Sequence, residues 1–296
     1  MSLTDLGTEQ IREKDRSYVF HPSTHLAQHS RGETPNRIMV GAEGVYIWDS
    51  ESRERLAGFG GLYFVNIGYG CAEIADAIAQ QAKELSFAHV YASQGTALVA
   101  LLGEAVVEYF GQDMRIVYFR LSGSDANETN IKLVWSYNNI LGRPQKKKII
   151  SPHRGYHGSG LVTGSLMGLP FFNEHFDLPR DVVRHATTPH WYRQAREGET
   201  EEAFSKRCAD ELEALIIAED PSTVGAFIGE PILGTGGIGP PPKGYWSAIQ
   251  TVLHKYDIRV IADEVVYGFG RTGEKVGSRL YGIRLVWVTP LGHAAI

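Results

Sequence analysis

Runs of apolar residues alternate with amphipathic helical patterns along most of this chain, and this alternation restricts its fold more than any other feature. The strand candidates are residues 115–121, 148–151, 224–230 and 259–263. Residues that recur every three or four positions form helical faces around them: Ile74, Ala75, Ile78, Ala82 and Leu85; Leu98, Leu101, Leu102, Ala105 and Tyr109; Phe204, Cys208, Leu212 and Leu215; and Trp246, Ile249, Leu253 and Tyr256. Strands that alternate with helices of this length predict an α/β fold, in which helices sandwich a mostly parallel sheet.

The first part of the chain lacks this alternation. Residues 1–60 contain only short β-like pieces such as 45–48, whereas the helical and strand patterns begin at Glu73. We therefore predict an N-terminal segment over residues 1–60 and an α/β domain over residues 61–296.

Composition limits the partners of this chain. With 296 residues, of which 43% are hydrophobic and 21% charged, it has material for a large core. A net charge of −5 and a longest basic run of only residues 146–148 argue against nucleic acid binding. The polar N-terminus lacks the apolar core of a signal peptide, and no run approaches the ~18 apolar residues of a membrane span. Cys71 and Cys208 are too few and too far apart for a disulfide framework, which predicts a reducing, cytoplasmic location. Together with the charge and the lack of a long apolar run, this predicts a protein without nucleic acid or membrane partners.

Small and polar residues join the apolar run at 115–121 to the next amphipathic helix. Residues 122–130 read SGSDANETN. Small residues let the backbone approach an anion, and a helix that begins near Ser124 directs unpaired N–H groups and the positive end of its dipole at the same point. Ser124 and Thr129 add hydroxyl donors, and Asp125 or Asn127 can cap the first turn. The segment predicts a phosphate site, although an ordinary capped helix uses the same residue types.

Polar groups also follow the other predicted strands. Glu230 and Asp263 end two of them, and residues 153–158 (HRGYHG) follow a third. Ligands of such sheets bind outside the carboxyl ends of the strands, so these groups are expected at one rim with the phosphate site. Asp263 follows an apolar strand and is expected to be partly buried. It then needs a partner, for which a protonated heterocyclic nitrogen, a salt bridge or a helix cap would each serve.

Taken together, these residues resemble the class III aminotransferases, which are pyridoxal-phosphate enzymes of fold type I, and among them most closely the amine–pyruvate (omega-) transaminases. The resemblance is continuous from about residue 15 to residue 283. Five ordered motifs carry it: residues 42–49 (AEGVYIWD), 122–129 (SGSDANET), 154–158 (RGYHG), 230–237 (EPILGTGG) and 262–273 (ADEVVYGFGRTG). It implies transfer of an amino group from an amine to a keto acid such as pyruvate, pyridoxal 5'-phosphate as cofactor, and a homodimer. The sequence leaves open which amine or keto acid is used.

The resemblance implies roles for individual residues. Gly123 and Ser124 would hold the cofactor phosphate, while Tyr156 and Val265 would cover the two faces of the pyridine ring. Asp263 would pair with the ring nitrogen, because a protonated nitrogen lets the ring absorb the carbanion formed when the substrate proton leaves.

Further residues are expected near the same ring. Glu230 resembles the acid that orders the network around Asp263, and His157 would pack against the cofactor or hydrogen-bond beside it. Leu62 and Tyr63 resemble walls of the amine pocket, although simple core or dimer packing explains them as well.

One part of the family pattern is missing from this chain. Members carry a lysine that forms the Schiff base with the cofactor and moves the substrate proton; its expected position falls near Gly292, and no lysine occurs after Lys275. Lys275, Lys243 and Lys132 are poor substitutes, because a catalytic amine needs near-attack geometry. The residues after Ile283 also depart from the family pattern. We therefore expect an incomplete large domain, C-terminally truncated and lacking the small domain, with no catalytic residue and little or no transaminase activity.

Two further functions stay open beside this one. The chain could bind pyridoxal phosphate, or pair with a full-length relative, without catalysis. Alternatively it could be a non-functional fragment, with sheet faces and edges left exposed.

Two other patterns resemble binding motifs, one for a dinucleotide and one for a metal, but each lacks the context that such a motif requires. Residues 268–273 (GFGRTG) match the dinucleotide-binding G-x-G-x-x-G, but they do not directly follow the strand, and no clean helix or later acid completes the motif, so a tight loop beside the cofactor is expected. His21, His25 and His29 are spaced by four, but Pro22 interrupts a helix, and no carboxylate or cysteine is found to complete a ligand set. We therefore expect a loop of polar residues there, and no metal.

Overall fold

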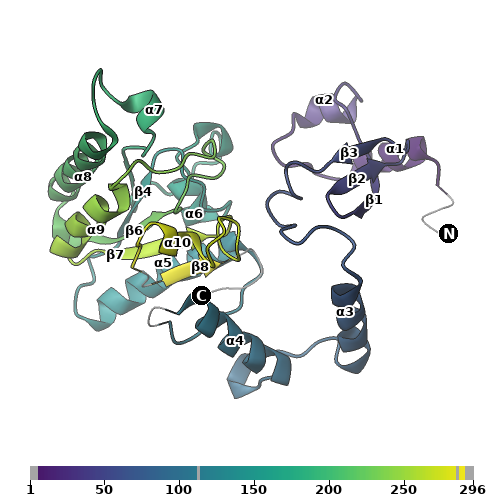
Figure 1. Ribbon diagram of the computed structural model, residues 1–296, viewed down its shortest axis with the longest axis horizontal. Helices are drawn as coiled ribbons and strands as arrows, with labels where there is room; N and C mark the ends of the chain where they lie inside the picture. Colours follow the sequence, from purple (N-terminus) through teal and green to yellow (C-terminus); the bar gives the residue numbers. More distant parts are fainter. Residues whose placement is uncertain (1–5, 112–113, 285–286, 291–296) are drawn as a thin grey trace. The chain divides into compact units, whose positions relative to one another are not determined.

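The structure, a computed structural model, describes residues 6–111, 114–284 and 287–290. Contacts divide the chain into two compact units, Met1–Gln94 and Gly95–Ile296 (Figure 1). The expected boundary at residue 60 lies inside the first unit. Each unit has its own sheet, antiparallel in the first and parallel in the second.

The first unit combines a small antiparallel meander with helices. Its elements are α1 (Thr8–Tyr18), α2 (Leu26–Ser30), β1 (Met39–Glu43), β2 (Tyr46–Asp49), β3 (Glu54–Leu56) and α3 (Ala72–Glu84). A two-residue turn joins β1 to β2, where Glu43 pairs with Tyr46. Gly44 starts this turn with a φ of 56°, a conformation that glycine adopts without strain. The short β-like piece predicted near residue 46 is therefore confirmed as β2.

The second unit is built on a parallel sheet in the strand order β5-β4-β6-β7-β8. Its strands are β4 (Lys148–Pro152), β5 (Val183–Ala186), β6 (Val224–Gly229), β7 (Arg259–Glu264) and β8 (Trp287–Pro290). Its helices are α4 (Ala97–Phe110), α5 (Gly123–Ile140), α6 (Leu161–Leu166), α7 (Trp191–Gln194), α8 (Glu201–Ala218), α9 (Tyr245–Lys255) and α10 (Gly277–Leu280). Short 3-10 turns lie at η3 (Pro170–Phe172) and η4 (Pro221–Thr223), whereas the turn η2 (Tyr91–Ser93) belongs to the first unit.

Helices cover both faces of the parallel sheet (Figure 1). Successive side chains of a strand point to opposite faces. Ile150 and Phe227 accordingly pack with α8 and α9, whereas Ile149 and Ile228 pack with α5 and α6. All four side chains are fully buried, and burying such a side chain contributes about 1.5–3 kcal/mol. The predicted α/β sandwich with a parallel sheet is confirmed.

Three strand assignments differ from the sequence prediction. Residues 115–121 form no strand, although the apolar run predicted one. A strand needs a hydrogen-bonded neighbour, and Ile116 and Leu121 are instead 79% and 85% exposed. By contrast, β5 and β8 were not predicted; each is only four residues long, too short to show a clear period.

Two predicted helices form but bury little of their apolar face. α3 has no buried residue, and Ile74 and Ile78 are exposed. On α4 only Val106 and Phe110 are buried, while Leu98 and Leu101 are exposed. Apolar faces of this kind normally pack against another surface. Among the described residues, no helix combines the length and apolar character needed to cross a membrane.

Candidate active site

Asp263 lies near the carboxyl end of β7 and is only 4% exposed. Its Oδ2 accepts hydrogen bonds from Asn127 Nδ2 at 2.8 Å and from His157 Nδ1 at 2.9 Å. Its Oδ1 accepts one from the backbone N–H of Val265 at 3.2 Å. The buried carboxylate predicted here is confirmed, with a histidine and an amide as its protein partners. Two carboxylate oxygens offer about four acceptor positions, so a position on Oδ1 remains for a further donor.

Asn127 holds this carboxylate because it is itself fixed on both sides. Its Nδ2 also donates to the carbonyl of His157 at 2.9 Å, and its Oδ1 accepts from Thr289 Oγ1 at 2.6 Å. Asn130 Nδ2 donates to the same Thr289 oxygen at 2.8 Å. These bonds tie the first turns of α5 to the ends of β7 and β8. The sequence analysis gave Asn127 only a capping role and did not find Asn130 or Thr289.

The first turn of α5 leaves backbone donors free. Ser122 is its N-cap, and Ser122 Oγ accepts from the N–H of Asp125 at 3.2 Å. The predicted caps are therefore wrong: Asp125 pairs with Arg120 instead, and Asn127 reaches Asp263. Within the part of the chain that the structure describes, the N–H groups of Gly123 and Ser124 have no acceptor. Free N–H groups at a helix N-terminus attract an anion.

Glycines allow two segments to approach this turn closely. A Cβ on Gly123 would lie 2.7 Å from Val265 Cγ2, so only glycine leaves room for that side chain. A Cβ on Gly158 would lie 2.7 Å from Ser124 Cα, and the φ of Gly158 is 130°. The N–H of Ser159 then donates to Ser124 Oγ at 3.1 Å, which leaves the Ser124 hydroxyl hydrogen free to donate.

Glu230 supports the loop that contains Tyr156 and His157. It follows β6, and its two oxygens accept from the N–H of Tyr156 at 3.0 Å and of Gly234 at 2.7 Å. Burial raises the pKa of Glu230 to about 7, against the opposing effect of the nearby His157. Burial, followed by the charge of Asp263, also raises the pKa of Tyr156.

The structure therefore brings most of the predicted site residues into one network. Contacts connect Ser124, Gly123, Val265, Asp263, His157, Tyr156 and Glu230. Leu62 and Tyr63 belong to the first unit, where both have a positive φ and the Tyr63 ring lies 5.0 Å from that of Phe59. The position near Gly292, where the family lysine was expected, lies outside the described residues.

The glycine-rich segment at 268–273 forms consecutive turns, as predicted. Gly270 and Gly273 have φ values of 87° and 88°, and the Phe269 ring stacks on Tyr109 at 5.1 Å. The next helix, α10, begins only at Gly277 and has four residues. A dinucleotide-binding turn that opens directly into a helix is thus absent from this segment.

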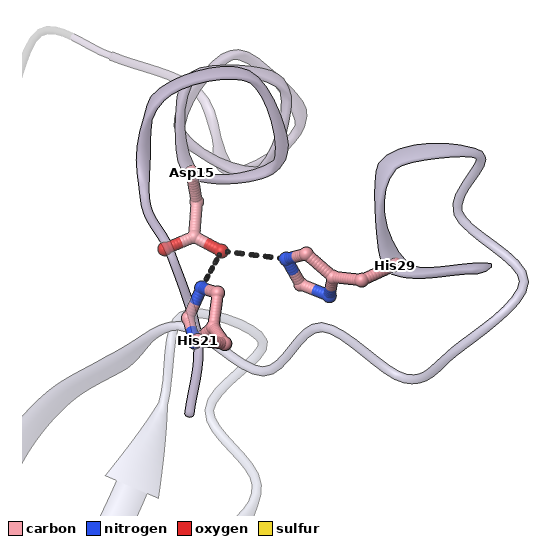
Figure 2. Close-up of side chains that lie close together, drawn as sticks. All are labelled: Asp15, His21 and His29. Carbon is pink, nitrogen blue, oxygen red and sulfur yellow. Dashed lines mark hydrogen bonds and ion pairs between the residues drawn. The ribbon is translucent and has the colours of Figure 1, made fainter. Parts of the chain in front are cut away.

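The three evenly spaced histidines do not all share one partner. His25 Nδ1 accepts from the N–H of Gln28 and caps α2. His21 and His29 instead face the carboxylate of Asp15 (Figure 2). The expectation that no carboxylate accompanies these histidines is therefore wrong, because Asp15 precedes the repeat on α1 and the chain folds back over it.

Comparison with known proteins identifies the class to which this fold and site belong. The family model for class III aminotransferases matches residues 27–284. The chain is 55% identical over 278 residues to diaminobutyrate–2-oxoglutarate transaminase of Halomonas elongata, which covers 93% of this chain and 59% of that protein. It is 45% identical over 248 residues to a probable gamma-aminobutyrate transaminase of rice, over 83% of this chain and 50% of that protein.

Solved structures of transaminases match the fold of this chain. A structure from the directed evolution of transaminases by ancestral reconstruction matches with a TM-score of 0.93 at 59% identity, over 96% of this chain and 62% of that one. The omega transaminase of Pseudomonas jessenii in complex with PMP matches with a TM-score of 0.90 at 43% identity, over 92% of this chain and 60% of that one. The chain belongs to the class III aminotransferases, a family that depends on pyridoxal phosphate. It spans about 60% of the length of these first relatives.

Proposed function

We propose that the network around Asp263 is the pyridoxal phosphate site of an aminotransferase that moves an amino group from an amine to a keto acid such as pyruvate. One observation carries this proposal. The buried carboxylate of Asp263 is hydrogen-bonded to Asn127, which lies about one turn of α5 after the free N–H groups of Gly123 and Ser124. A cofactor with a phosphate at one end and a basic ring nitrogen at the other needs both groups.

The residues present fit this cofactor. The free N–H groups of Gly123 and Ser124, with the Ser124 hydroxyl, suit the phosphate, and the open acceptor position on Asp263 Oδ1 suits a protonated ring nitrogen. His157 Nε2 is buried and has no hydrogen-bond partner among the described residues. Buried polar atoms are normally paired, so an unpaired nitrogen on the ring that holds Asp263 also agrees with a ligand at this site.

Each residue of the network then has a distinct task. Once bound, the cofactor supplies an electron sink for the carbanion that forms when the substrate loses a proton. Asp263 keeps the proton on the ring nitrogen, and His157 and Asn127 hold Asp263 in place. Val265 and Tyr156 would cover the ring faces. Glu230 fixes the backbone of Tyr156. We keep Leu62 and Tyr63 as proposed walls of the amine pocket.

We propose that the chain of 296 residues does little or no transamination by itself. It contains no lysine after Lys275, and the family reaction uses a lysine amine next to the cofactor. A tethered group of this kind corresponds to an effective concentration of roughly 10⁵ M or more, which a free amine in solution does not reach.

Binding of pyridoxamine phosphate tests the site, because that cofactor form needs no lysine. Isothermal titration with the purified chain should show binding that Asp263→Asn weakens about tenfold to a hundredfold, since a hydrogen bond to a charged group contributes about 1.5–3 kcal/mol. Asp257→Asn is the matched control, because Asp257 is half exposed and has a φ of 51° that asparagine tolerates. No binding, or equal binding by both variants, would contradict the proposed site.

A separate assay tests the proposed inactivity. The chain is incubated with an amine, pyruvate and pyridoxal phosphate, and alanine formation is followed. We expect none above the rate without protein. Turnover at rates usual for enzymes would show that one of Lys132, Lys243 or Lys275 replaces the missing amine.

A non-catalytic pairing role is the second candidate, and the exposed apolar residues of α4 favour it. Leu98, Leu101 and Leu102 are each at least half exposed on one helix. Surfaces of this kind normally lie in an interface. Sedimentation analysis of the chain, alone and mixed with a full-length relative, distinguishes a pairing partner from a fragment that aggregates without defined stoichiometry.

A further inference from the structure

Three side chains of the first unit place metal-binding atoms around one point. Asp15 lies on α1, His21 on the segment after it and His29 on α2 (Figure 2). Asp15 Oδ2 is 2.9 Å from His21 Nε2 and 3.4 Å from His29 Nε2, and one donor atom from each residue lies within 4.8 Å of the others. The cluster is contained in residues 15–29 and does not involve the proposed cofactor site.

The spacing of these atoms is close to that of ligands on one ion. Two donor atoms about 2.1 Å from a tetrahedral cation lie about 3.4 Å apart. The observed separations of 2.9 and 3.4 Å differ from this value by half an ångström or less. Two imidazole nitrogens and one carboxylate oxygen also form a donor set that zinc accepts, with a fourth position for water.

His29 provides an independent observation. It is 5% exposed, and among the described residues its Nε2 has no partner other than Asp15 Oδ2, which lies 3.4 Å away. Its Nδ1 lies 3.3 Å from Thr34 Oγ1. If Nδ1–H donates to that hydroxyl, the lone pair of Nε2 faces the carboxylate of Asp15. Two lone pairs then face each other, and a cation between them removes the repulsion.

The surrounding groups hold the donor atoms in place. Asn36 Nδ2 donates to Asp15 Oδ2 at 2.8 Å, and Arg12 Nε donates to the Asn36 carbonyl at 3.0 Å. Outer contacts of this kind, like that of Thr34 to His29, orient the ligands in protein metal sites. Access is also available, because the His21 side chain is 33% exposed and that of Asp15 is 19% exposed.

We propose that Asp15, His21 and His29 form a binding site for one divalent transition-metal ion, for which Zn²⁺ is the probe. The ion is coordinated by one carboxylate oxygen and the two Nε2 atoms, and it joins α1 to α2. The alternative is an ion pair without a metal, in which a proton on a histidine ring, rather than a cation, lies between that ring and the carboxylate of Asp15.

Zinc binding by the full chain tests this proposal. After incubation with Zn²⁺ and dialysis against buffer, we expect about one retained ion per chain, measured by elemental analysis. Asp15→Asn and His21→Gln should each weaken binding more than ~100-fold, beyond the loss expected for an outer contact. Thr34→Val should weaken it ~10–100-fold. His25→Asn is the control, since it removes a neighbouring imidazole while asparagine keeps the helix cap, and its binding should equal that of the parent chain.

Two measurements keep the test decisive if a variant folds poorly. Circular dichroism shows whether His21→Gln, at a partly exposed position, retains its secondary structure. Co²⁺ then reports the coordination directly, because tetrahedral Co²⁺ absorbs visible light far more strongly than hydrated Co²⁺. Absence of retained zinc would leave a histidine–carboxylate ion pair and overturn the proposal. Retention that survives in Asp15→Asn and His21→Gln would also overturn it, and would move the binding to another pair such as His153 and His185.

Discussion

Two aspartates in this chain hold the same kinds of partner in different surroundings. Asp263 accepts from the amide of Asn127 at 2.8 Å and from the ring of His157 at 2.9 Å. Asp15 accepts from the amide of Asn36 at 2.8 Å and lies 2.9 Å from the ring of His21. The side chain of Asp263 is 5% exposed, whereas that of Asp15 is 19% exposed.

The partners of the two aspartates come from different distances along the chain. His157 and Asn127 are 106 and 136 residues from Asp263, whereas His21 and Asn36 are 6 and 21 residues from Asp15. The Asp263 cluster therefore exists only when α5, β7 and the loop after β4 are assembled. The Asp15 cluster forms within a short segment of the chain, from Asp15 to Asn36. Local clusters of this kind open at a lower free energy than the core does.

Removing each carboxylate in turn tests the difference between the two aspartates, and the largest effect on stability is expected here. Asp263→Ala leaves a buried histidine and amide without their acceptor and should lower the free energy of unfolding by about 3–5 kcal/mol. Asp15→Ala should cost only about 1 kcal/mol, because water reaches two of the remaining partners, His21 and Asn36. Urea unfolding followed by circular dichroism measures both. Equal losses would show that burial does not separate the two clusters.

The buried network around Asp263 should also make the free energy of unfolding depend on pH, through the raised pKa of Glu230. Its pKa is about 7 in the folded chain and 4.5 in the unfolded chain, so the folded state binds more protons between these values. Stability from this group is therefore present below pH 4.5 and is lost as the pH rises to 7. The difference in pKa corresponds to about 3 kcal/mol.

Glu230→Gln isolates this contribution. His185, whose burial lowers its pKa to about 4, acts in the opposite direction, because its unfolded form binds the extra proton. The informative quantity is thus the loss of unfolding free energy between pH 5 and 7.5, compared between parent chain and variant. We expect the larger loss in the parent chain. Parallel curves would show that Glu230 ionises normally in the folded state.

Packing against the first turn of α5 predicts a smaller effect. Gly123→Ala places a methyl group 2.7 Å from Val265 Cγ2 and should cost about 1–3 kcal/mol, together with weaker binding of pyridoxamine phosphate. Gly103→Ala is the matched control, since nothing lies within 4 Å of its added Cβ on α4, and it should be neutral or stabilising by up to about 1 kcal/mol. Thermal and urea unfolding of both variants check this; equal behaviour would contradict the close approach of Val265.

The smallest effect is expected at His25. Its ring caps α2, so His25→Ala should cost about 0.5–1 kcal/mol, and His25→Asn should restore most of that loss. Hydrogen exchange at the N–H of Gln28 reports the cap directly. Full stability of His25→Ala with unchanged exchange would remove the capping role.

The sequence predicted most of the parallel unit, and it selected many of the residues that form the network around Asp263. The period of 3.6 residues located α8 and α9, and apolar runs located β4, β6 and β7. Gly123, Ser124, Asp263 and Glu230 were predicted from their places at strand ends and at a helix start. Asn127 and Thr289 were not, because no local pattern shows that an amide and a hydroxyl 162 residues apart will share a hydrogen bond.

The sequence by itself determined the alternation of helices and strands, and with it a parallel sheet whose strand ends collect polar groups. Periodicity and small residues at a helix start depend on neighbours in the chain, so they are legible without coordinates. Only the tertiary structure decided that α3 buries no residue, that residues 115–121 form no strand, and that Asp15 faces two histidines. These outcomes depend on which surface or hydrogen-bond partner arrives from elsewhere in the chain, and that is a property of assembled contacts rather than of any local pattern.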